Sequence, residues 1–128
     1  MATILIVDDD DMMRDMLLQM METDGHSAMG AADGKKAIGL LENNVFELVV
    51  TDLIMPEKEG LETIRYLKKN HPHIPIIAIS GGTKMDPESY LGIAKMLGAK
   101  YTFTKPIDRA AFLAAIKECV KNNNDPSQ

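Results

Sequence analysis

The stretch ILIVDDDDMM, residues 4–13, sets four carboxylates directly behind an apolar run. Short continuous apolar runs are typical of strands that are buried on both faces of a parallel sheet. Repulsion among adjacent like charges costs stability unless something cationic answers it. The stretch therefore predicts a buried strand over residues 3–7 whose end leads into a site for a cation.

Three further apolar runs match this one. They cover residues 47–51, 74–79 and 100–104, and residues 27–32 form a weaker candidate strand. Apolar residues at helical spacing lie between the runs: Met13, Leu17 and Met20; Ala37, Ile38 and Leu41; Leu61, Ile64 and Leu67; Leu91, Ala94 and Leu97; Phe112, Ile116 and Val120. This alternation predicts an α/β fold of the (βα)5 type, a five-stranded parallel sheet with helices on both faces.

Local signals agree with the predicted boundaries. Asp33, Asp86 and Asp108 stand where the N-caps of helices belong. Gly25 and Gly98 fall where helices should stop. The chain shows no internal repeat, low-complexity tract or linker, which favours a single domain.

The composition is that of one compact globular domain. The 128 residues are 45% hydrophobic and 26% charged, and we expect a domain over residues 1–121 with a polar tail over 122–128. The net charge of −5, without a cluster of Lys and Arg, argues against direct binding of nucleic acid. No apolar run approaches the roughly 20 residues that span a bilayer, and no secretory signal is visible, so we expect no membrane contact and a cytoplasmic location.

Three residue types receive structural interpretations. The single cysteine, Cys119, cannot form an internal disulfide and lies in an apolar helical pattern, so it is interpreted as packing. The crowded methionines are interpreted as gap fillers of the core, with an adaptable Met-rich interface as the less favoured alternative: Met12, Met13, Met16, Met20 and Met21. The histidines lie in predicted turns without metal-ligand spacing and are interpreted as solvated: His26, His71 and His73.

Carboxylates end two of the predicted strands. Asp8 and Asp9 follow the first strand, and Asp52 follows the third in order along the chain. In open parallel sheets, ligands bind beyond the carboxyl ends of the strands, where the strand order reverses. If the order is 2-1-3-4-5, the three carboxylates converge, and a hard divalent cation such as Mg²⁺ would offset their repulsion.

The remaining strand ends supply groups that bind phosphate. Ser80 ends the fourth strand with a hydroxyl donor beside two glycines, and Lys105 ends the fifth with a positive charge. Together with the carboxylates they suit the transfer of a phosphoryl group to the central carboxylate. Taken singly, Asp52 and Ser80 could be turn or loop residues, and Asp10 and Asp11 are interpreted as a cap or as solvated side chains.

The chain resembles a response-regulator receiver domain, the phosphoacceptor half of two-component signalling, over residues 2–121. The stretches ILIVDDD, VVTDLIMPEKEG, AISG and TKP match the signature segments of that family in order and spacing. The resemblance implies a doubly wound, flavodoxin-like sheet of order 2-1-3-4-5. It also implies a sensor histidine kinase or phosphotransfer protein as the phosphodonor, with a small phosphodonor as an alternative, and an unknown protein as the downstream target.

The resemblance implies a role for each site residue. Asp52 would be the phosphorylated nucleophile, and Asp9 a direct Mg²⁺ ligand that Asp8 assists. The site would be completed by a backbone carbonyl ligand, a switch hydroxyl and a charge partner: Ile54, Ser80 and Lys105.

One feature departs from the usual pattern of the family, and two further positions bear on dephosphorylation. The position three residues before the lysine, commonly Tyr or Phe, is Thr102, and strand alternation prevents its neighbours Tyr101 and Phe103 from replacing it. We therefore expect the hydroxyl half of the switch without its aromatic half. The two positions that tune dephosphorylation hold Ile54 and Gly82, neither of which can orient a water through its side chain, so we expect slow self-hydrolysis.

Other classes of function remain open from the sequence. Asp8 and Asp10 form an Asp-x-Asp at a strand end, which resembles the site of haloacid-dehalogenase-type phosphohydrolases, although this leaves Asp52 without a role. A calcium loop is disfavoured because the Gly and Glu that it needs are missing. A phosphorylation-independent interaction domain on a receiver scaffold is a further alternative. We expect the output to be a partner protein, unless the chain is a piece of a larger regulator.

Overall fold

Strands and helices alternate along the chain. The computed structural model describes residues 2–53, 59–80, 92, 94–96 and 98–124. Its elements are β1 (Thr3–Val7), α1 (Asp11–Thr23), β2 (Ser27–Ala31), α2 (Gly34–Asn43), β3 (Leu48–Asp52), α3 (Glu59–Asn70), β4 (Ile76–Ser80), β5 (Tyr101–Thr104) and α5 (Arg109–Asn124). Residues 94–96 are also helical, whereas most of the segment predicted as a fourth helix lies outside the described residues.

The five strands form one parallel sheet of order β2-β1-β3-β4-β5, as predicted. β1 and β3 are therefore neighbours in the middle of the sheet, although a strand and two helices separate them in the sequence. Their register pairs Val7 with Thr51, so the residues that follow them, Asp8 and Asp52, emerge side by side. The topology thus places the carboxylates of two distant segments at one edge of the sheet.

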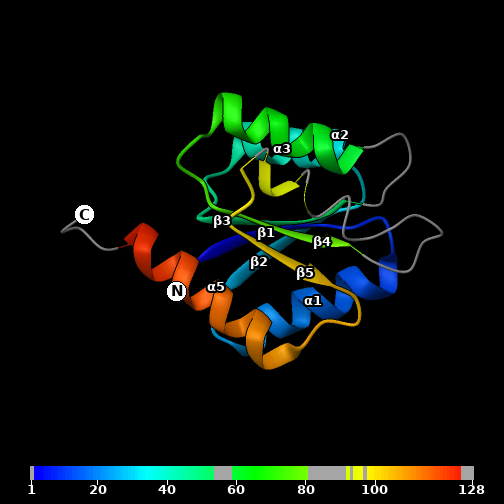
Figure 1. Ribbon diagram of the computed structural model, residues 1–128, viewed down its shortest axis with the longest axis vertical. Helices are drawn as coiled ribbons and strands as arrows, with labels where there is room; N and C mark the ends of the chain where they lie inside the picture. Colours follow the sequence, from blue (N-terminus) through cyan, green and yellow to red (C-terminus); the bar gives the residue numbers. More distant parts are fainter. Residues whose placement is uncertain (1, 54–58, 81–91, 93, 97, 125–128) are drawn as a thin grey trace.

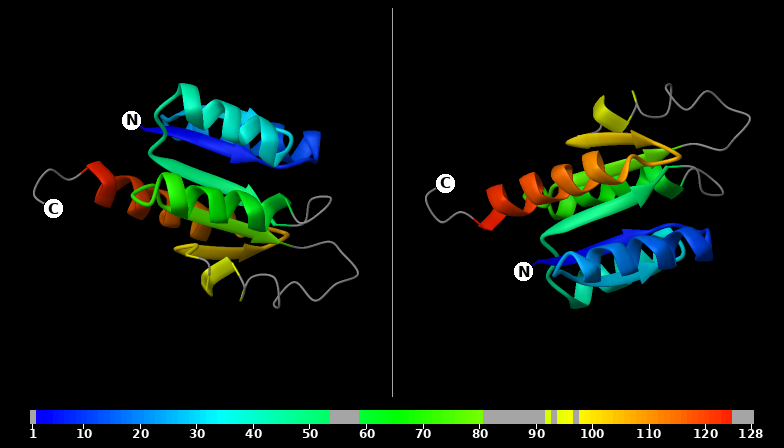
Figure 2. Two further views of the ribbon diagram at one scale, coloured as in Figure 1. Left: turned by 90° about the horizontal axis from the view of Figure 1, so that it is seen from above. Right: turned by 90° about the horizontal axis from the view of Figure 1, so that it is seen from below.

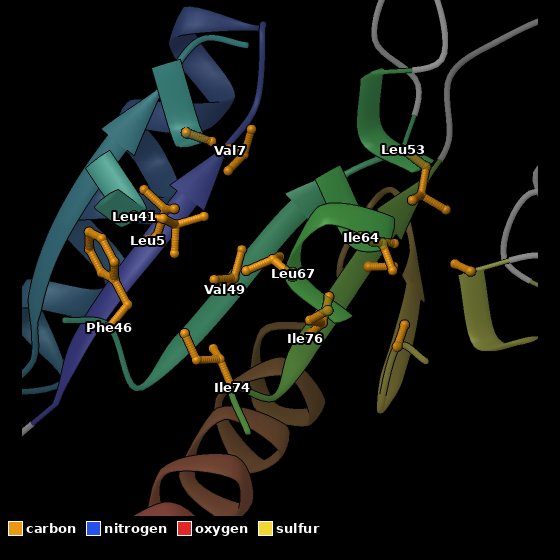
Figure 3. Close-up of a cluster of buried hydrophobic side chains, with 14 of the residues drawn as sticks. Leu5, Val7, Leu41, Phe46, Val49, Leu53, Ile64, Leu67, Ile74 and Ile76 are labelled. Atoms are coloured by element: carbon orange, nitrogen blue, oxygen red, sulfur yellow. The ribbon is translucent and has the colours of Figure 1, made fainter. Parts of the chain in front are cut away.

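Helices cover both faces of the sheet. In Figure 1, α2 and α3 lie above the strands and α1 and α5 lie below them, and the two views of Figure 2 show the same arrangement from above and below. Each pair of helices buries its own hydrophobic cluster, because side chains alternate between the two faces along every strand. Leu5 and Val49 belong to the cluster beneath α2 and α3, which Figure 3 shows, while Ile4 and Val50 belong to the one beneath α1 and α5.

The helix boundaries follow the predicted signals. Asp10 is the N-cap of α1 and accepts hydrogen bonds from the backbone N–H groups of Met12 and Met13 at 3.0 and 3.2 Å. Asp33 accepts from the N–H of Lys36 at 2.8 Å at the start of α2. Aspartate performs this role because its carboxylate satisfies N–H groups that have no partner within the helix.

The signals predicted at Asp108, Gly25 and Gly98 are also confirmed. Asp108 accepts from two N–H groups at the start of α5, and Gly25 and Gly98 have φ angles of 89° and 118°, which favour glycine after a helix. Asp86 falls outside the described residues.

Several strand bounds differ from the predicted ones by one residue, and two boundaries differ by more. β4 begins at Ile76 rather than at residue 74 because Pro75 has no N–H to donate to a neighbouring strand. α5 continues to Asn124, past residue 121, where the domain was expected to end. The division between a domain over 1–121 and a tail over 122–128 stays a prediction.

The interpretation of the methionines as core residues is correct only in part. Met20 and Met21 are buried, but Met12 is 84% exposed and Met16 is 47% exposed. Met13, Met16 and Met20 line a groove of about 480 Å³ that reaches Lys105. The error arises because spacing of one residue type does not tell which face of α1 meets the sheet.

His26 is also less solvated than expected. Its Nδ1 accepts a hydrogen bond from the backbone N–H of Ala2 at 3.3 Å, and its Nε2 lies 3.5 Å from a carboxylate oxygen of Asp24. Across the described parts of the chain, we find no helix with the length and apolar character that a bilayer crossing requires.

Candidate functional site

Three carboxylates meet at the carboxyl ends of β1 and β3. Oxygen atoms of Asp8, Asp9 and Asp52 all lie within 4.8 Å of one another. Asp8 and Asp52 are only 1% and 3% exposed, whereas Asp9 is exposed. Three converging carboxylates, two of them buried, supply the hard oxygen ligands that Mg²⁺ prefers while leaving one side open to solvent.

Lys105 brings a positive charge to two of these carboxylates, Asp52 and Asp8. Its Nζ lies 3.2 Å from Oδ2 of Asp52 and 3.5 Å from Oδ2 of Asp8. Burial on its own would lower the pKa of Lys105, but Asp52 and Asp8 outweigh this effect, so the pKa is raised above its ordinary value of 10.5. Lys105 therefore stays protonated near neutral pH and can offer a positive charge to an anion bound at Asp52.

Ser80 is the last residue of β4, the strand next to β3, and lies at the same carboxyl-end side of the sheet. The backbone N–H of Lys105 donates to the carbonyl of Ser80 at 2.8 Å, which ties the ends of β4 and β5 together. The Ser80 side chain is fully buried, and its Oγ has no hydrogen-bond partner among the residues that the structure describes. A buried hydroxyl without a partner costs free energy. The Ser80 hydroxyl could therefore gain a hydrogen bond by donating to an oxygen of a bound anion.

The loop after β1 is tied down by its own hydrogen bonds. Oδ1 of Asp8 accepts from the backbone N–H of Asp10 at 2.9 Å. The carboxylate of Asp10 turns the other way and caps α1. Asp10 is thus used at the helix, and the geometry gives no support to Asp8 and Asp10 as a nucleophile and acid pair.

Sequence reasoning missed one residue at this site. Nη1 of Arg14 donates to the backbone carbonyl of Asp8 at 2.8 Å, and Nη2 contacts the carboxylate of Asp11. The spacing of Asp11 and Arg14 on a helix signals their ion pair. No local pattern signals a bond to the carbonyl of a residue in the preceding loop.

Thr102 lies on the same face of the sheet as Ser80, as strand alternation predicts. It is in register with Ala78, two residues before Ser80, whereas Tyr101 and Phe103 pack on the opposite face with α5. The Phe103 ring meets Phe112 edge to face, with ring centroids 5.4 Å apart. Neither aromatic neighbour occupies the face that Thr102 shares with Ser80.

Some predicted site positions lie outside the described residues. These are Ile54, expected to offer a backbone carbonyl to the metal, and Gly82, expected to slow dephosphorylation. Their roles stay predictions.

Comparison with known proteins identifies the family of this chain. Residues 4–117 match the sequence profile of the response regulator receiver domain. The chain belongs to the response regulator receiver domain family. This confirms the resemblance seen in the sequence motifs and makes the chain a receiver domain of two-component response regulators.

Individual relatives of this receiver domain are distant in sequence. The transcriptional regulatory protein CpxR of Escherichia coli (strain K12) is 30% identical over 124 residues, which cover 97% of this chain and 51% of CpxR. The response regulator MprA of Mycobacterium sp. (strain KMS) is 31% identical over 121 residues, which cover 94% of this chain and 51% of MprA. The receiver domain thus spans about half the length of these curated relatives.

The fold of the receiver domain also matches solved structures. A CheY-like response regulator receiver domain protein from Methanospirillum hungatei JF-1 superimposes with a TM-score of 0.86 at 28% identity, covering 96% of each chain. Receiver domains bind Mg²⁺ at an acidic pocket, and the cluster of Asp8, Asp9 and Asp52 has that character.

Proposed function

We propose that this receiver domain accepts a phosphoryl group on Asp52 in a Mg²⁺-dependent reaction. The observation that carries the proposal is the surroundings of the Asp52 carboxylate. It is buried at the end of β3, next to the ammonium of Lys105 and within 4.8 Å of the oxygens of two further carboxylates. A nucleophilic carboxylate needs this combination, because the incoming phosphoryl group brings negative charge into an acidic pocket.

The transfer exchanges one bond to phosphorus for another. An oxygen of Asp52 attacks phosphorus, the bond to the donor nitrogen of a phosphohistidine breaks, and that imidazole nitrogen keeps the electron pair and takes up a proton. The ammonium of Lys105 neutralises charge on the phosphoryl oxygens, and the hydroxyl of Ser80 donates a hydrogen bond to one of them. Bound Mg²⁺, held by Asp8, Asp9, Asp52 and the carbonyl of Ile54, would supply further neutralisation of negative charge.

We further propose that the chain is a signalling domain and not an enzyme with an external substrate. The donor would be a sensor histidine kinase, a phosphotransfer protein or a small phosphodonor in the cytoplasm, without involvement of a membrane. The output would be a protein whose binding surface changes when Ser80 engages the phosphoryl group. Because Thr102 replaces the usual aromatic residue, the hydroxyl would act without an aromatic partner.

Phosphorylation of the purified protein tests the assignment of Asp52. The protein is incubated with acetyl phosphate and MgCl₂, and the intact mass is measured. We expect one added phosphoryl group in the original protein and none in Asp52→Asn, which keeps the shape of the side chain. Asp11→Asn is the matched control, because Asp11 lies in the same acidic run but is 80% exposed, and it should still be labelled.

Each alternative function predicts a different result. A phosphorylation-independent interaction domain would take no label in the original protein. A haloacid-dehalogenase-type phosphohydrolase would turn over p-nitrophenyl phosphate, for which we expect no turnover. Label on Asp52→Asn would also overturn the proposal. Decay of the label within seconds would contradict the slow self-hydrolysis expected from Ile54 and Gly82.

A further inference from the structure

Arg14 joins the first turn of α1 to the end of β1. Its side chain is only 17% exposed, and one guanidinium nitrogen donates to the backbone carbonyl of Asp8 at 2.8 Å. The other terminal nitrogen contacts Asp11, one turn back on the same helix. An arginine can make both contacts at once because its donors form a rigid planar fork.

β2 leaves room for the Arg14 stem. A Cβ atom added to Gly30 would lie 3.1 Å from Cδ of Arg14 and 3.1 Å from a methyl carbon of Leu18. Nearly any side chain at this position would therefore press on the stem of Arg14. The path of the stem from α1 to the Asp8 carbonyl depends on the absence of a side chain at Gly30.

The carbonyl that Arg14 holds belongs to the peptide between Asp8 and Asp9. The other polar groups of Asp8 are also held: its N–H donates to the carbonyl of Ala31 at 3.1 Å, and its carboxylate contacts the N–H of Asp10 and the ammonium of Lys105. Rotation of the Asp8–Asp9 peptide is what would swing the exposed Asp9 carboxylate away from the other two. Among the residues that the structure describes, Arg14 makes the only hydrogen bond to the oxygen of that peptide.

We propose that Arg14 is a positioning residue for the divalent cation site, which it serves by fixing the Asp8–Asp9 peptide so that the Asp9 carboxylate faces Asp8 and Asp52. This rests on the proposed Mg²⁺ site. Arg14 touches neither the metal nor the phosphoryl group and acts through the backbone of a predicted ligand. Groups that orient a metal ligand in this way typically change metal affinity by about 10-fold to 100-fold when removed.

Electrostatics alone predicts the opposite result. Arg14 places a positive charge close to an acidic pocket, so its removal should strengthen the attraction of the pocket for a cation. A positioning role predicts weaker binding despite this gain. The sign of the change in Mg²⁺ affinity therefore separates the two roles.

The test is calorimetric titration of the metal-free protein with MgCl₂. We expect the dissociation constant of Arg14→Ala to rise by about tenfold. Asp11→Asn is the control: it removes the exposed partner of Arg14 but leaves the bond to Asp8, and exposed pairs are screened, so its constant should change by less than about twofold. Amide shifts of Asp9 and Asp10 in the metal-free protein, expected to move in Arg14→Ala, give a readout that needs no metal.

A second variant keeps the charge and disturbs only the path of the stem. Gly30→Val suits a strand but crowds Arg14, and we expect weaker Mg²⁺ binding here too; it decides the matter if Arg14→Ala does not fold. Binding by a folded Arg14→Ala that is as tight as in the original protein, or tighter, overturns the proposal. If the original protein itself binds no Mg²⁺, the proposed function fails, and this result is distinct from failure of Arg14 alone.

Discussion

Replacement of Lys105 by methionine should destabilise the metal-free protein by about 2 kcal/mol. Each contact of Nζ with Asp52 and Asp8, at 3.2 and 3.5 Å, is worth about 5 kcal/mol by Coulomb's law at an effective dielectric constant of about 20. The cost of burying the charges offsets much of this gain, and removal of one partner from a buried pair typically costs about 3 to 5 kcal/mol. Because the Lys105 side chain is 22% exposed, solvent screens part of the effect, and we expect a loss of about 2 kcal/mol, below that range.

Urea unfolding followed by circular dichroism measures this change. In EDTA, Lys105→Met should lose about 2 kcal/mol, while Lys117→Met, which removes an exposed lysine of α5, should stay within about 0.5 kcal/mol of the original protein. MgCl₂ should restore stability to Lys105→Met, by about 2.7 kcal/mol when the free ion exceeds its dissociation constant a hundredfold. Equal stability of Lys105→Met and the original protein in EDTA would refute the view that Lys105 neutralises buried carboxylates.

The pH dependence of this contribution follows from the raised pKa of Lys105. A group whose pKa is higher in the folded state than in the unfolded state stabilises the protein fully below the unfolded value, here 10.5. The stabilisation is lost only when the pH rises through the raised folded value. The difference between Lys105→Met and the original protein should therefore stay constant from pH 6 to pH 9.

Four further changes have defined outcomes. Ser80→Ala removes a buried hydroxyl without a described partner, so stability to urea should be unchanged or rise by up to about 1 kcal/mol, whereas the amide shifts caused by beryllofluoride around β4 and β5 should disappear; persistence of those shifts would contradict the switch role. Phe112→Ala empties a fully buried site against Phe103 and should cost about 3 to 5 kcal/mol in the same unfolding assay, and a loss below 1 kcal/mol would be inconsistent with the packing. Asp33→Ala removes the N-cap of α2 and should cost about 1 kcal/mol, an expectation that fails if the urea midpoint does not move. Burial raises the pKa of Cys119 to about 11, so a disulfide reagent should react slowly at pH 8 unless urea is present, and the stability that the neutral thiol preserves below pH 9 should be lost as the pH rises through about 11.

The parts of the fold and site that sequence predicted are those set by local rules. The run before Asp8 defined β1 because a strand buried on both faces must be apolar throughout, and Asp33 marked the start of α2 because free N–H groups need an acceptor. The convergence of Asp8 and Asp52 needed one non-local fact, the neighbouring position of β1 and β3, which the family resemblance supplied.

The parts that sequence did not predict depend on contacts between distant segments. The exposure of Met12 and Met16 depends on how α1 is rotated against the sheet. The bond from Arg14 to Asp8 depends on a chain bend, and its path depends on Gly30 in another strand. That Ser80 Oγ has no hydrogen-bond partner among the described residues is likewise a property of the folded environment and not of its neighbours in the sequence.

The central position of β1 and β3 has a consequence for how the domain can diversify. The strands that carry Asp8 and Asp52 have partners on both sides, whereas β2 and β5 form the perimeter of the sheet. Local opening of an edge strand, or a substitution in it, disturbs the inner strands little, because edge elements open more readily than inner ones. A sheet built in this way can alter its outer surfaces for new partners while the spacing of its innermost charges stays fixed.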